Sequence, residues 1–455
     1  MSLTCFKAYD IRGRLGAELD ESIAYRIGRG FARALTAETV VLGRDVRPTS
    51  EALADAVAQA LIDEGVEVLE LGLCGTEEVY AATGDTGASG GICITASHNP
   101  MDYNGMKLVG AGAAPLDPQG ALAKIRRLAE ADGFGPAKPG GARRDISAAA
   151  RAAYVDRVAG FVDAATLGPL KIVVNAGHGA AGPTFDALAE TLAARGAALE
   201  FIRIHHAPDP TFPAGIPNPL LPENRPVTAG AVRTHGADFG IAWDGDFDRC
   251  FFFDHEGRFV DGEYVVGLLA AAFLAKSPGA TIVHDPRVVW NTQDVVARAG
   301  GHAVQARTGH AFLKRAMREA NAIYGGEMSA HHYFRDFFFC DSGMIPWLLM
   351  ADLVSRDGPL ANLVAARQAA FPSSGEINFR VADVAQAIAG VEGAFAPDAR
   401  GIDRTDGVSL DMGDWRFNLR GSNTEPLLRL NVEAKGDRGL VDDAVARIGA
   451  LIGGL

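Results

Sequence analysis

The sequence predicts a multidomain α/β protein with mixed sheets, and three observations support this fold class. The chain has 455 residues, too many for one hydrophobic core, and this length suggests about three or four domains. Over the first 368 residues, short apolar runs typical of buried strands alternate with helix patterns, as they do in βαβ units. After a Pro-Ser-Ser-Gly break at 372–375, several strand patterns precede one closing helix, which predicts a smaller α+β domain.

Composition and charge favour a soluble cytoplasmic protein. The net charge of -13 disfavours a nucleic-acid binder, which needs a basic face. The longest apolar run, 265–275, is too short to span a bilayer, and the N-terminus lacks a signal-peptide pattern. The five cysteines are scattered without a CxxC pair, which disfavours disulfides and a zinc site. We therefore expect no nucleic-acid or membrane partner, and a monomer or weak homodimer.

The first predicted domain, 1–145, contains a βαβ unit. Apolar residues recur every four positions over 23–35 behind a candidate cap at Asp20, which predicts an amphipathic helix. The patterns that follow predict a strand at 40–43, a helix capped by Thr49 or Ser50, and a strand at 66–71. A Gly- and Pro-rich stretch at 133–141 is typical of a linker and closes this domain.

Ser97 occupies the most informative position in this domain. The apolar run 92–94 predicts a buried strand, so Ser97 lies where the strand ends and a loop begins, a common place for chemistry in open α/β sheets. His98 and Asn99 could orient a group carried on its hydroxyl, although a polar turn that merely caps a strand explains the same residues. The stretch 104–108 then predicts a tight turn into a strand and holds Lys107, ten residues beyond Ser97.

Two motifs in the sequence resemble known sites but lack the required context. Gly87–Gly91 matches the G-x-S-x-G string of hydrolases, but its strand follows the serine instead of preceding it. Gly177–Gly182 matches G-x-G-x-x-G after the strand 172–174, yet the next strand, 199–204, ends in histidines where a dinucleotide site needs an acidic residue. We interpret the second motif as a strand-to-helix turn.

The second predicted domain, 146–253, ends in an acidic loop with a strand on either side. The loop has an aspartate at every second position, Asp244, Asp246 and Asp248, and Gly245 separates the first two. Three carboxylates packed this closely repel one another unless a cation neutralises them, and hard oxygen ligands suit Mg²⁺. The spacing lacks the glycine and glutamate that an EF-hand requires. The loop therefore predicts a magnesium site.

The third predicted domain, 254–368, places polar residues after successive strands. Arg287 follows a strand at 281–284, and Thr308, Gly309 and His310 follow a strand at 302–305. After a strand at 322–324, the residues Glu327, Ser329 and His331 alternate and would share one face if this stretch is extended. Such a face would suit a polyol, although ordinary loop polarity remains an alternative. His331 and His332 fit a metal less well than the acidic loop does.

The fourth predicted domain, 369–455, contains a candidate anion site. Strand patterns at 377–381, 408–412, 415–419 and 427–432 precede a helix over 440–451. Between the last two strands, 420–426 combines an arginine, hydroxyls, an asparagine and a glycine, which suits a phosphate cradle and equally suits a capped turn.

These motifs together resemble the α-D-phosphohexomutase family, and closely its bacterial phosphomannomutase/phosphoglucomutase group. The resemblance covers nearly the whole chain and rests on four stretches in order: 95–100, 244–249, 326–329 and 420–424. It implies three related α/β domains and a smaller fourth domain around a central cleft. It also implies that Phe247 replaces a commoner glycine, and that the Met in Gly-Glu-Met-Ser is typical of enzymes acting on mannose and glucose phosphates.

The resemblance implies a role for each matching residue. Ser97 would carry the transferable phosphoryl group, and one of its oxygens would join Asp244, Asp246 and Asp248 around Mg²⁺. Glu327 and Ser329 would bind the sugar hydroxyls, and the clamp on the non-reacting phosphate would comprise Arg420, Ser422, Asn423 and Thr424. Positions lining the cleft would be Arg12, Lys107, Arg249, Arg287, His310 and His331. We also expect His98 to take part in catalysis, and substrate contacts from Tyr9, Thr308, Gly309 and Arg429.

The implied activity is reversible phosphoryl transfer between C1 and C6 of a hexose phosphate, through phosphoserine 97 and a hexose 1,6-bisphosphate. Lys107 or His331 would take the proton from the attacking hydroxyl. Closure of the fourth domain would exclude water from the phosphoserine. The alternatives are a phosphoglucomutase as the main activity, a non-catalytic protein that binds sugar phosphates, and a magnesium-dependent phosphatase.

Overall fold

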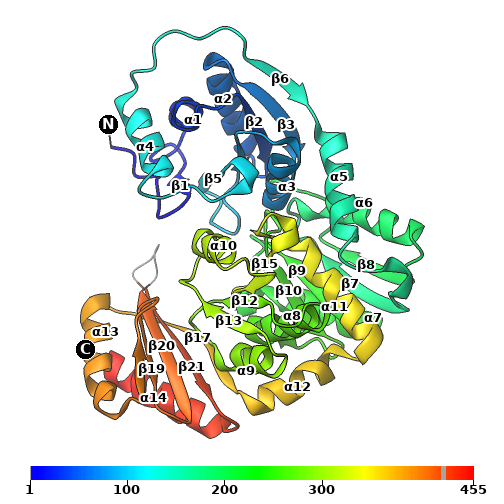
Figure 1. Ribbon diagram of the computed structural model, residues 1–455, viewed down its shortest axis with the longest axis vertical. Helices are drawn as coiled ribbons and strands as arrows, with labels where there is room; N and C mark the ends of the chain where they lie inside the picture. The colour runs from blue at the N-terminus through cyan, green and yellow to red at the C-terminus, as the bar shows by residue number, and fades with distance from the viewer. Residues whose placement is uncertain (1, 422–426, 455) are drawn as a thin grey trace. The chain divides into compact units, whose positions relative to one another are not determined.

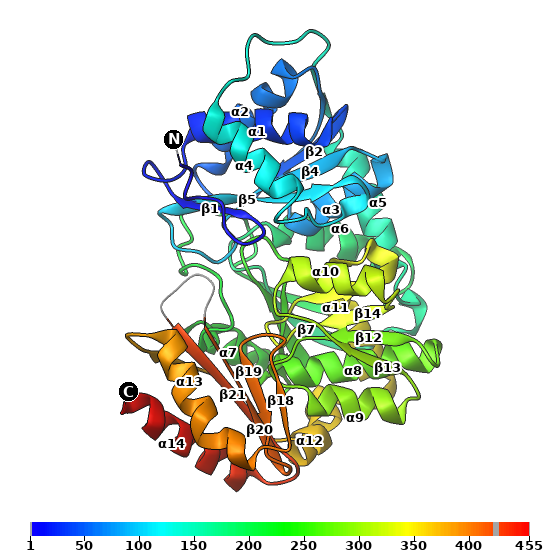
Figure 2. The ribbon, with the colours of Figure 1, turned by 60° about the vertical axis from the view of Figure 1, so that its left-hand side comes forward.

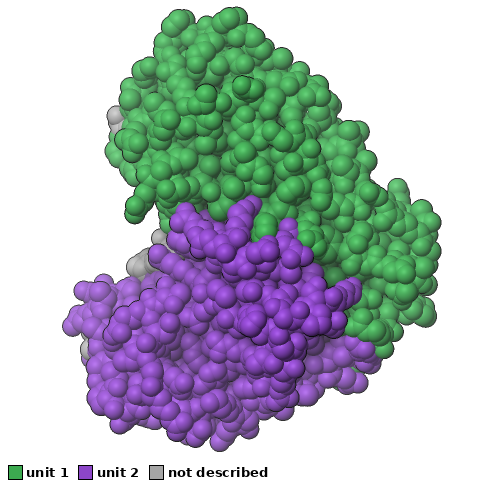
Figure 3. All heavy atoms as spheres, viewed as in Figure 1, with its two compact units in different colours: residues 1–259, 336–356 green, residues 260–335, 357–455 purple. Residues whose placement is uncertain are grey.

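The computed structural model describes residues 2–421 and 427–454 (Figure 1). The chain divides into two compact units, whose residues Figure 3 colours separately. Unit 1 comprises 1–259 and 336–356, and unit 2 comprises 260–335 and 357–455. In the part of the chain that is described, no helix is both long and apolar enough to cross a membrane.

The first sheet of unit 1 is mixed and has the order β1-β5-β4-β2-β3-β6. Strand β2 pairs in parallel with β3 and β4, whereas β5 pairs antiparallel with β1 and β4. The strands are Ile11–Arg14, Thr39–Arg44, Glu67–Leu73, Gly90–Ile94, Tyr103–Gly110 and Ala142–Asp145 for β1 to β6. The helices are Glu21–Leu35, Ser50–Asp63, Thr76–Thr86 and Ala121–Ala131 for α1 to α4.

The predicted helix behind Asp20 is confirmed as α1. The Asp20 side chain accepts a hydrogen bond from the Ile23 amide, which satisfies one of the free N–H groups of the first turn. The apolar stripe of α1 is buried in the core, where Ile27 and Phe31 have no exposed surface. Thr49 precedes α2 as predicted, but it has helical backbone angles and makes no side-chain cap. The tight turn into a strand that was predicted within 104–108 comes earlier: the turn lies at 101–102, and all of 104–108 belongs to β5.

The Gly- and Pro-rich stretch at 133–141 is anchored by a buried carboxylate. The Glu64 side chain is 1% exposed, and its Oε1 accepts hydrogen bonds of 2.7 Å from both Arg29 Nε and Arg33 Nε. Lys138 Nζ lies 2.6 Å from Glu64 Oε2. Both arginines also donate to the carbonyl of Phe134. The stretch is therefore held against the first domain by one ionic cluster.

We expect Glu64→Gln to lower the free energy of unfolding by about 2–4 kcal/mol, because it leaves the buried guanidinium of Arg29 without its counter-charge. Urea unfolding followed by circular dichroism measures this loss. The matched control is Glu67→Gln, since Glu67 pairs with Arg144 at 2.8 Å but both side chains are at least one-third exposed. Its effect should stay below about 1 kcal/mol. Equal effects of the two substitutions would contradict this account.

The same cluster predicts a pH dependence. Burial alone would raise the pKa of Glu64, but the hydrogen bonds from Lys138, Arg29 and Arg33 outweigh it and leave the pKa below its ordinary value. A carboxylate with a lowered pKa stabilises the fold above its unfolded pKa, and this stabilisation is lost as the pH falls through the folded pKa. The stability difference between the parent protein and Glu64→Gln should therefore narrow below about pH 4.

The second sheet of unit 1 carries the acidic loop. Strands β10-β9-β7-β8 lie in this order, with β7 parallel to β8 and β9, and β9 antiparallel to β10. The strands are Leu170–Asn175, Leu199–Ile204, Phe239–Trp243 and Cys250–Asp254 for β7 to β10, and the units divide within β11 (Phe259–Val260). The helices α5 to α7 are Ser147–Ala159, Ala181–Ala194 and Pro226–His235. The segment 336–356 adds β16 (Cys340–Asp341) and most of α11 (Met344–Asp357).

The turn that contains Gly177–Gly182 runs from β7 into α6, as predicted, and it supports the acidic loop. The Ala180 amide donates a 3.0 Å hydrogen bond to the carbonyl of Gly245. A Cβ on Gly179 would lie 2.7 Å from that same carbonyl oxygen. The glycine therefore permits close packing of two loops.

Unit 2 contains a mixed sheet with the order β13-β12-β14-β15. Strand β12 is parallel to β13 and β14, and β14 is antiparallel to β15. The strands are Thr281–His284, His302–Gln305, Tyr324–Gly326 and His332–Phe334 for β12 to β15. The helices are Gly262–Lys276, Trp290–Arg298, His310–Glu319 and Leu360–Ala370 for α8, α9, α10 and α12.

The expectation of an extended stretch around Glu327 is wrong. The strand begins at Tyr324, two residues later than predicted, and 327–331 forms the turn between β14 and β15. The Glu327 amide bonds to the carbonyl of His331 at 2.9 Å, and Ala330 adopts a left-handed conformation with φ of 70°. The alternation of side chains in a strand therefore does not apply here.

The second sheet of unit 2 is wholly antiparallel, with the order β17-β21-β20-β19-β18. Helices α13 and α14 pack on it around one apolar core (Figures 1 and 2). The strands are Ser373–Arg380, Gly401–Asp403, Val408–Asp411, Trp415–Gly421 and Leu427–Ala434 for β17 to β21, and the helices are Val384–Phe395 and Arg438–Gly453. The sequence patterns predicted neither β18, which is exposed, nor α13.

Candidate active site

Ser97 lies in the loop between β4 and β5 and faces the acidic loop. The residue is 2% exposed, and its Oγ donates a 2.7 Å hydrogen bond to Asp244 Oδ2. His98 Nδ1 lies 3.0 Å from the same Oγ. Ser97 has a φ of 49°, a left-handed conformation that is uncommon outside glycine. The loop thus aims the hydroxyl at a carboxylate that is 147 positions away in the chain.

The acidic loop connects β9 to the antiparallel strand β10 and buries three carboxylates. Asp244, Asp246 and Asp248 have no exposed surface, and one oxygen of each lies within 4.8 Å of the others. Gly245 is required here, because a Cβ on this residue would lie 2.7 Å from the carbonyl oxygen of Ser97. Close contact between the two loops therefore depends on the glycine of the Asp-Gly-Asp motif.

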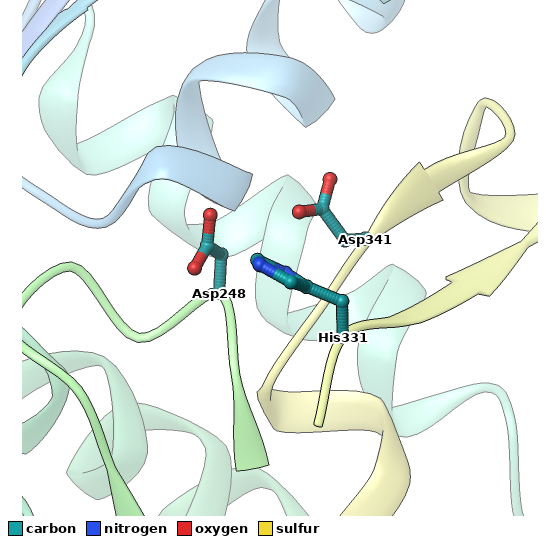
Figure 4. A group of neighbouring side chains, drawn as sticks. All are labelled: Asp248, His331 and Asp341. Carbon is teal, nitrogen blue, oxygen red and sulfur yellow. The ribbon is translucent and has the colours of Figure 1, made fainter. Parts of the chain in front are cut away.

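This donor set fits a divalent cation with oxygen ligands. Asp244 Oδ1 and Asp246 Oδ1 are buried and have no hydrogen-bond partner within 2–421 and 427–454. Such buried oxygens are costly unless a cation or a hydrogen bond compensates them. An oxygen of Asp341, on β16, lies within 4.8 Å of an oxygen of Asp248 and extends the acidic group (Figure 4). The sequence patterns gave no indication of Asp341, which lies 93 positions from Asp248.

Lys107, on β5, supplies a positive charge to this group. Its Nζ lies 2.7 Å from Asp246 Oδ2 and also contacts Asp248. Burial would lower the pKa of Lys107, but these carboxylates and Asp244 outweigh burial and raise the pKa above its usual range. Burial would likewise raise the pKa of Asp246, but Lys107 keeps that pKa below its usual range. Lys107 is therefore a protonated ammonium at neutral pH.

Burial and the neighbouring Asp246 carboxylate raise the pKa of Asp244. Burial, together with Arg249 and Arg12, lowers the pKa of His98 well below its usual range. The imidazole beside Ser97 is therefore neutral at pH 7. In a neutral imidazole one ring nitrogen donates a hydrogen bond and the other accepts one.

Two of the predicted arginines also reach this region. Arg12, on β1, donates a 2.7 Å hydrogen bond to the carbonyl of Ala96 and a second bond to the Asn99 side chain. Arg249 Nε lies 3.7 Å from Asp244 Oδ2. Tyr9 is half-buried just before β1. The residues of unit 1 thus place cationic, acidic and nucleophilic groups together.

Phe247 has a φ of 46°, in the left-handed region that favours glycine. Its side chain is fully buried, and a Cβ on Gly75 would lie 2.2 Å from its ring. The Phe247 ring is therefore accommodated by the absence of a side chain on Gly75. Thr76, the next residue, donates a 2.6 Å hydrogen bond to Asp246 Oδ2, a contact that the sequence analysis missed.

A second group of predicted residues gathers around Arg287 in unit 2. Arg287 Nη2 donates to Asp285 Oδ2 at 2.6 Å and to Ser329 Oγ at 3.1 Å. The same atom lies 3.8 Å from Glu327 Oε1. Asp285 also accepts a hydrogen bond from the Met328 amide at 2.8 Å, so it fixes both Arg287 and the 327–331 turn. Asp285 was not predicted, although it directly follows β12 and precedes Arg287 by two positions.

Glu327 is fixed by hydrogen bonds on both carboxylate oxygens. The Gly309 amide donates to Oε1 at 2.9 Å, and the Tyr333 hydroxyl donates to Oε2 at 2.6 Å. Thr308 and His310 flank Gly309 and are half-buried, and the ring centroids of His310 and His331 lie 6.5 Å apart. His331 precedes β15 (Figure 4) and is 5% exposed. The residues that follow β13 and those of the turn between β14 and β15 therefore form one group of polar side chains.

The arginines of the fourth predicted domain converge on Glu376 of β17. Arg420 Nη2 lies 2.8 Å from Glu376 Oε2, and Arg429 Nη1 lies 3.3 Å from Glu376 Oε1. Arg287 Nη1 also approaches this carboxylate, at 3.6 Å. The predicted clamp residues Ser422, Asn423 and Thr424 lie outside the described residues. Glu376 was missed because a single glutamate on a strand has no motif around it.

The comparisons with known proteins match the whole chain. The family described as phosphoglucomutase/phosphomannomutase matches in four successive domains: alpha/beta/alpha domains I, II and III at residues 4–135, 152–257 and 261–371, and the C-terminal domain at 376–450. A phosphomannomutase of Salmonella typhimurium is 60% identical over 453 residues, which cover 99% of each chain. A protein of Xanthomonas campestris named phosphohexose mutases is 56% identical over the full length of both chains.

The solved structures agree with the sequence relatives. The crystal structure of a phosphoglucomutase/phosphomannomutase family protein from Burkholderia thailandensis superimposes with a TM-score of 0.86 at 30% identity, and covers 98% of this chain and 97% of its own. The predicted fold class, three α/β domains followed by a smaller α+β domain, is confirmed. The predicted family is confirmed as well: the chain belongs to the phosphoglucomutase/phosphomannomutase family.

Proposed function

We propose that this chain is a phosphomannomutase that interconverts mannose 1-phosphate and mannose 6-phosphate, with glucose phosphates as its second pair of substrates. The observation that carries this proposal is the 2.7 Å contact between Ser97 Oγ and Asp244 Oδ2, at the edge of a buried tri-aspartate group. A phosphoryl group carried on this hydroxyl would lie beside the cation that the three aspartates would hold. The relatives named for these reactions, at 56–60% identity, support the same activity.

The proposed reaction has two phosphoryl transfers. The bond between phosphorus and Ser97 Oγ breaks as the free hydroxyl of the hexose monophosphate forms a new bond to phosphorus, which yields the 1,6-bisphosphate. The bisphosphate then turns within the site and returns its other phosphoryl group to Ser97. A hexose 1,6-bisphosphate would therefore also activate a protein whose Ser97 lacks phosphate.

Charge neutralisation carries most of the catalysis in such transfers. We propose that Asp244, Asp246 and Asp248 hold Mg²⁺ together with an oxygen of the phosphorylated Ser97. Bound there, Mg²⁺ would stabilise negative charge on the phosphoryl oxygens. Arg12 and Arg249 add positive charge on the same side of the loop.

The proton of the attacking hydroxyl needs an acceptor. Lys107 or His331 would accept it. Lys107 Nζ also lies 2.7 Å from Asp246 Oδ2, where its ammonium form would stabilise negative charge. His98, neutral and 3.0 Å from Ser97 Oγ, would orient the phosphoserine.

The residues of unit 2 would bind the sugar phosphate. Glu327 and Ser329 would present oxygens to the sugar hydroxyls, with Thr308, Gly309 and His310 as further contacts. Tyr9, which belongs to unit 1, is a further proposed substrate contact. The clamp on the non-reacting phosphate would consist of Arg287, Arg420, Arg429 and the loop residues Ser422, Asn423 and Thr424. Glu376 forms ion pairs with three arginines. The bound phosphate would form ion pairs with the same three side chains.

The proposal also covers the domain boundaries, the oligomeric state and the cellular location. We propose domain boundaries near residues 145, 253 and 368. The first falls between two matched family ranges, and the other two lie just before the ends of the ranges at 257 and 371. We also propose a monomer or weak homodimer in the cytoplasm, a setting in which the five buried free thiols would remain reduced.

Phosphorus NMR with the purified protein, Mg²⁺ and a trace of hexose 1,6-bisphosphate tests the function. Mannose 1-phosphate should convert to mannose 6-phosphate, and glucose 1-phosphate should be compared at equal concentration. A faster conversion of the glucose compound would make phosphoglucomutase the main activity. Release of inorganic phosphate without isomer formation would identify a phosphatase, and binding without turnover would identify a regulator.

A further inference from the structure

A buried ion pair between β2 and α2 contacts the Ser97 loop from within the same domain. The side chains of Asp45 and Arg47 are each 2% exposed, and Arg47 Nε lies 3.7 Å from Asp45 Oδ2. Neither residue was among the candidates that the sequence suggested. Neither side chain contacts the Ser97 hydroxyl, so any effect on chemistry must pass through the loop backbone.

The Arg47 guanidinium donates hydrogen bonds to backbone carbonyl groups in and next to this loop. Nη2 donates to the carbonyl of Ser97 at 2.9 Å and also to that of Asn99. Nη1 donates to the carbonyls of Pro100 and Tyr103 at 2.9 and 3.2 Å. The planar guanidinium of Arg47 thus holds three carbonyl groups of the loop and the carbonyl of Tyr103, the first residue of β5.

Asp45 holds Arg47 in place and contacts the loop itself. Its Oδ1 accepts hydrogen bonds from the Arg47 amide at 3.0 Å and from Ser50 Oγ at 2.5 Å. Its Oδ2 lies 3.4 Å from the amide nitrogen of Ala96, which donates to it. The pair therefore supports the loop on both sides of Ser97.

The donor geometry separates Arg47 from the phosphate-binding arginines. A guanidinium has five N–H donors, of which four are on the two Nη atoms. The carbonyls of the loop engage both Nη atoms, and Nε faces Asp45. Both Nη atoms of Arg47 are therefore already occupied, and its hydrogen-bond partners within 2–421 and 427–454 all belong to its own domain. The Phe212 ring of the second domain lies 5.9 Å from the guanidinium and supplies no acceptor for these donors.

The loop needs such support because its conformation is uncommon. Ser97 has a φ of 49°, a left-handed conformation that is strained for residues other than glycine. Its carbonyl oxygen lies between Arg47 and Gly245, where a Cβ on Gly245 would come within 2.7 Å. Loss of the Arg47 contacts would let the backbone relax and turn the hydroxyl away from Asp244.

We propose that Arg47, held by Asp45, is a positioning residue that locks Ser97 in the conformation required for phosphoryl transfer. This inference rests on the proposed function in one respect, since it assigns Ser97 as the group that carries the phosphoryl. Its structural part, the locking of 97–103 by one guanidinium, stands on the contacts alone.

The test compares Arg47→Met and Arg47→Lys with the parent protein by steady-state kinetics and by hydrogen–deuterium exchange. Arg47→Met should lower kcat by about 100-fold, because displacements of about 1 Å at a reacting group have effects of this size. KM should change by less than about threefold, because no substrate contact is removed. Amide exchange in the peptide covering 96–104 should increase. For Arg47→Lys, kcat and amide exchange should lie between the values of the parent protein and those of Arg47→Met. An ammonium retains hydrogen-bond donors but cannot span both pairs of carbonyls.

Arg29→Met is the matched control, since Arg29 is also a buried arginine of this domain with carboxylate and carbonyl partners. It should destabilise the fold yet leave kcat of the folded protein and exchange of 96–104 unchanged. A kcat within about threefold of the parent for Arg47→Met, or a rise in KM at constant kcat, would overturn the positioning role. If Arg47→Met does not fold, Arg47→Lys decides by the same measurements. If the parent protein lacks mutase activity, the proposed function fails, while the exchange data still decide whether Arg47 locks the loop.

Discussion

Ser97→Ala is expected to reduce mutase turnover by a factor on the order of 10⁴ or more while the protein remains folded. The substitution removes the only atom on which the proposed phosphoserine can form, and removal of a nucleophile typically has effects of this size. The fold should persist, because Ser97 Oγ makes its contacts with Asp244 and His98 at the edge of the acidic group and not in the apolar core. Coupled assays measure turnover, and circular dichroism checks the fold.

Ser89→Ala is the matched control for this experiment. Ser89 lies eight positions earlier, immediately before β4, and its Oγ accepts hydrogen bonds from the amides of Glu38 and Thr39. It also occupies the serine position of the rejected hydrolase string. Ser89→Ala should keep turnover within about twofold of the parent. Comparable losses in both variants would indicate general destabilisation instead of a lost nucleophile.

Asp246→Asn is expected to weaken Mg²⁺ binding and to lower turnover by about 10³-fold. The change removes the charge of a ligand that is fully buried and that also orders Lys107 and Thr76. Hard divalent cations depend strongly on the charge of their oxygen ligands. Isothermal titration calorimetry with Mg²⁺ measures the binding. Chelation by EDTA should likewise abolish the activity of the parent protein, and added Mg²⁺ should restore it.

The control is Asp238→Asn, just before the other end of the same strand, β9. Asp238 is half-buried and accepts a 2.7 Å hydrogen bond from the Lys171 amide, so it has a structural role without a neighbouring carboxylate pair. Mg²⁺ affinity should be unchanged in this variant. Unaltered affinity in Asp246→Asn would show that the tri-aspartate group is not the metal site.

The sequence located the residues of the candidate site that lie directly after buried strands. Ser97 and the acidic loop follow short apolar runs, and their residue types have few structural explanations when they are clustered. Arg287 and Gly309 were found in the same way, after β12 and β13. In each case the apolar run predicts where the strand ends, and the residue types that follow it indicate the chemistry.

The sequence did not reveal the residues that act from a distance in the chain. Arg47 reaches a loop 50 positions away, and Glu376 balances arginines that come from three different strand ends or loops. Such contacts depend on tertiary packing, for which a single sequence has no local pattern. The extended stretch expected at 327–331 failed for a related reason, because a hydrogen bond from Glu327 to the carbonyl of His331 closes a turn there.

A chase experiment tests the central claim, that Ser97 passes its phosphoryl group to a hexose phosphate and takes it back. The protein is labelled with radioactive phosphate from hexose 1,6-bisphosphate, separated from free label, and mixed with unlabelled mannose 6-phosphate. We expect the label to leave the tryptic peptide containing Ser97 and to appear in mannose 1,6-bisphosphate and then in mannose 1-phosphate. Label that is released only as inorganic phosphate, or that resides on another residue, would contradict the account.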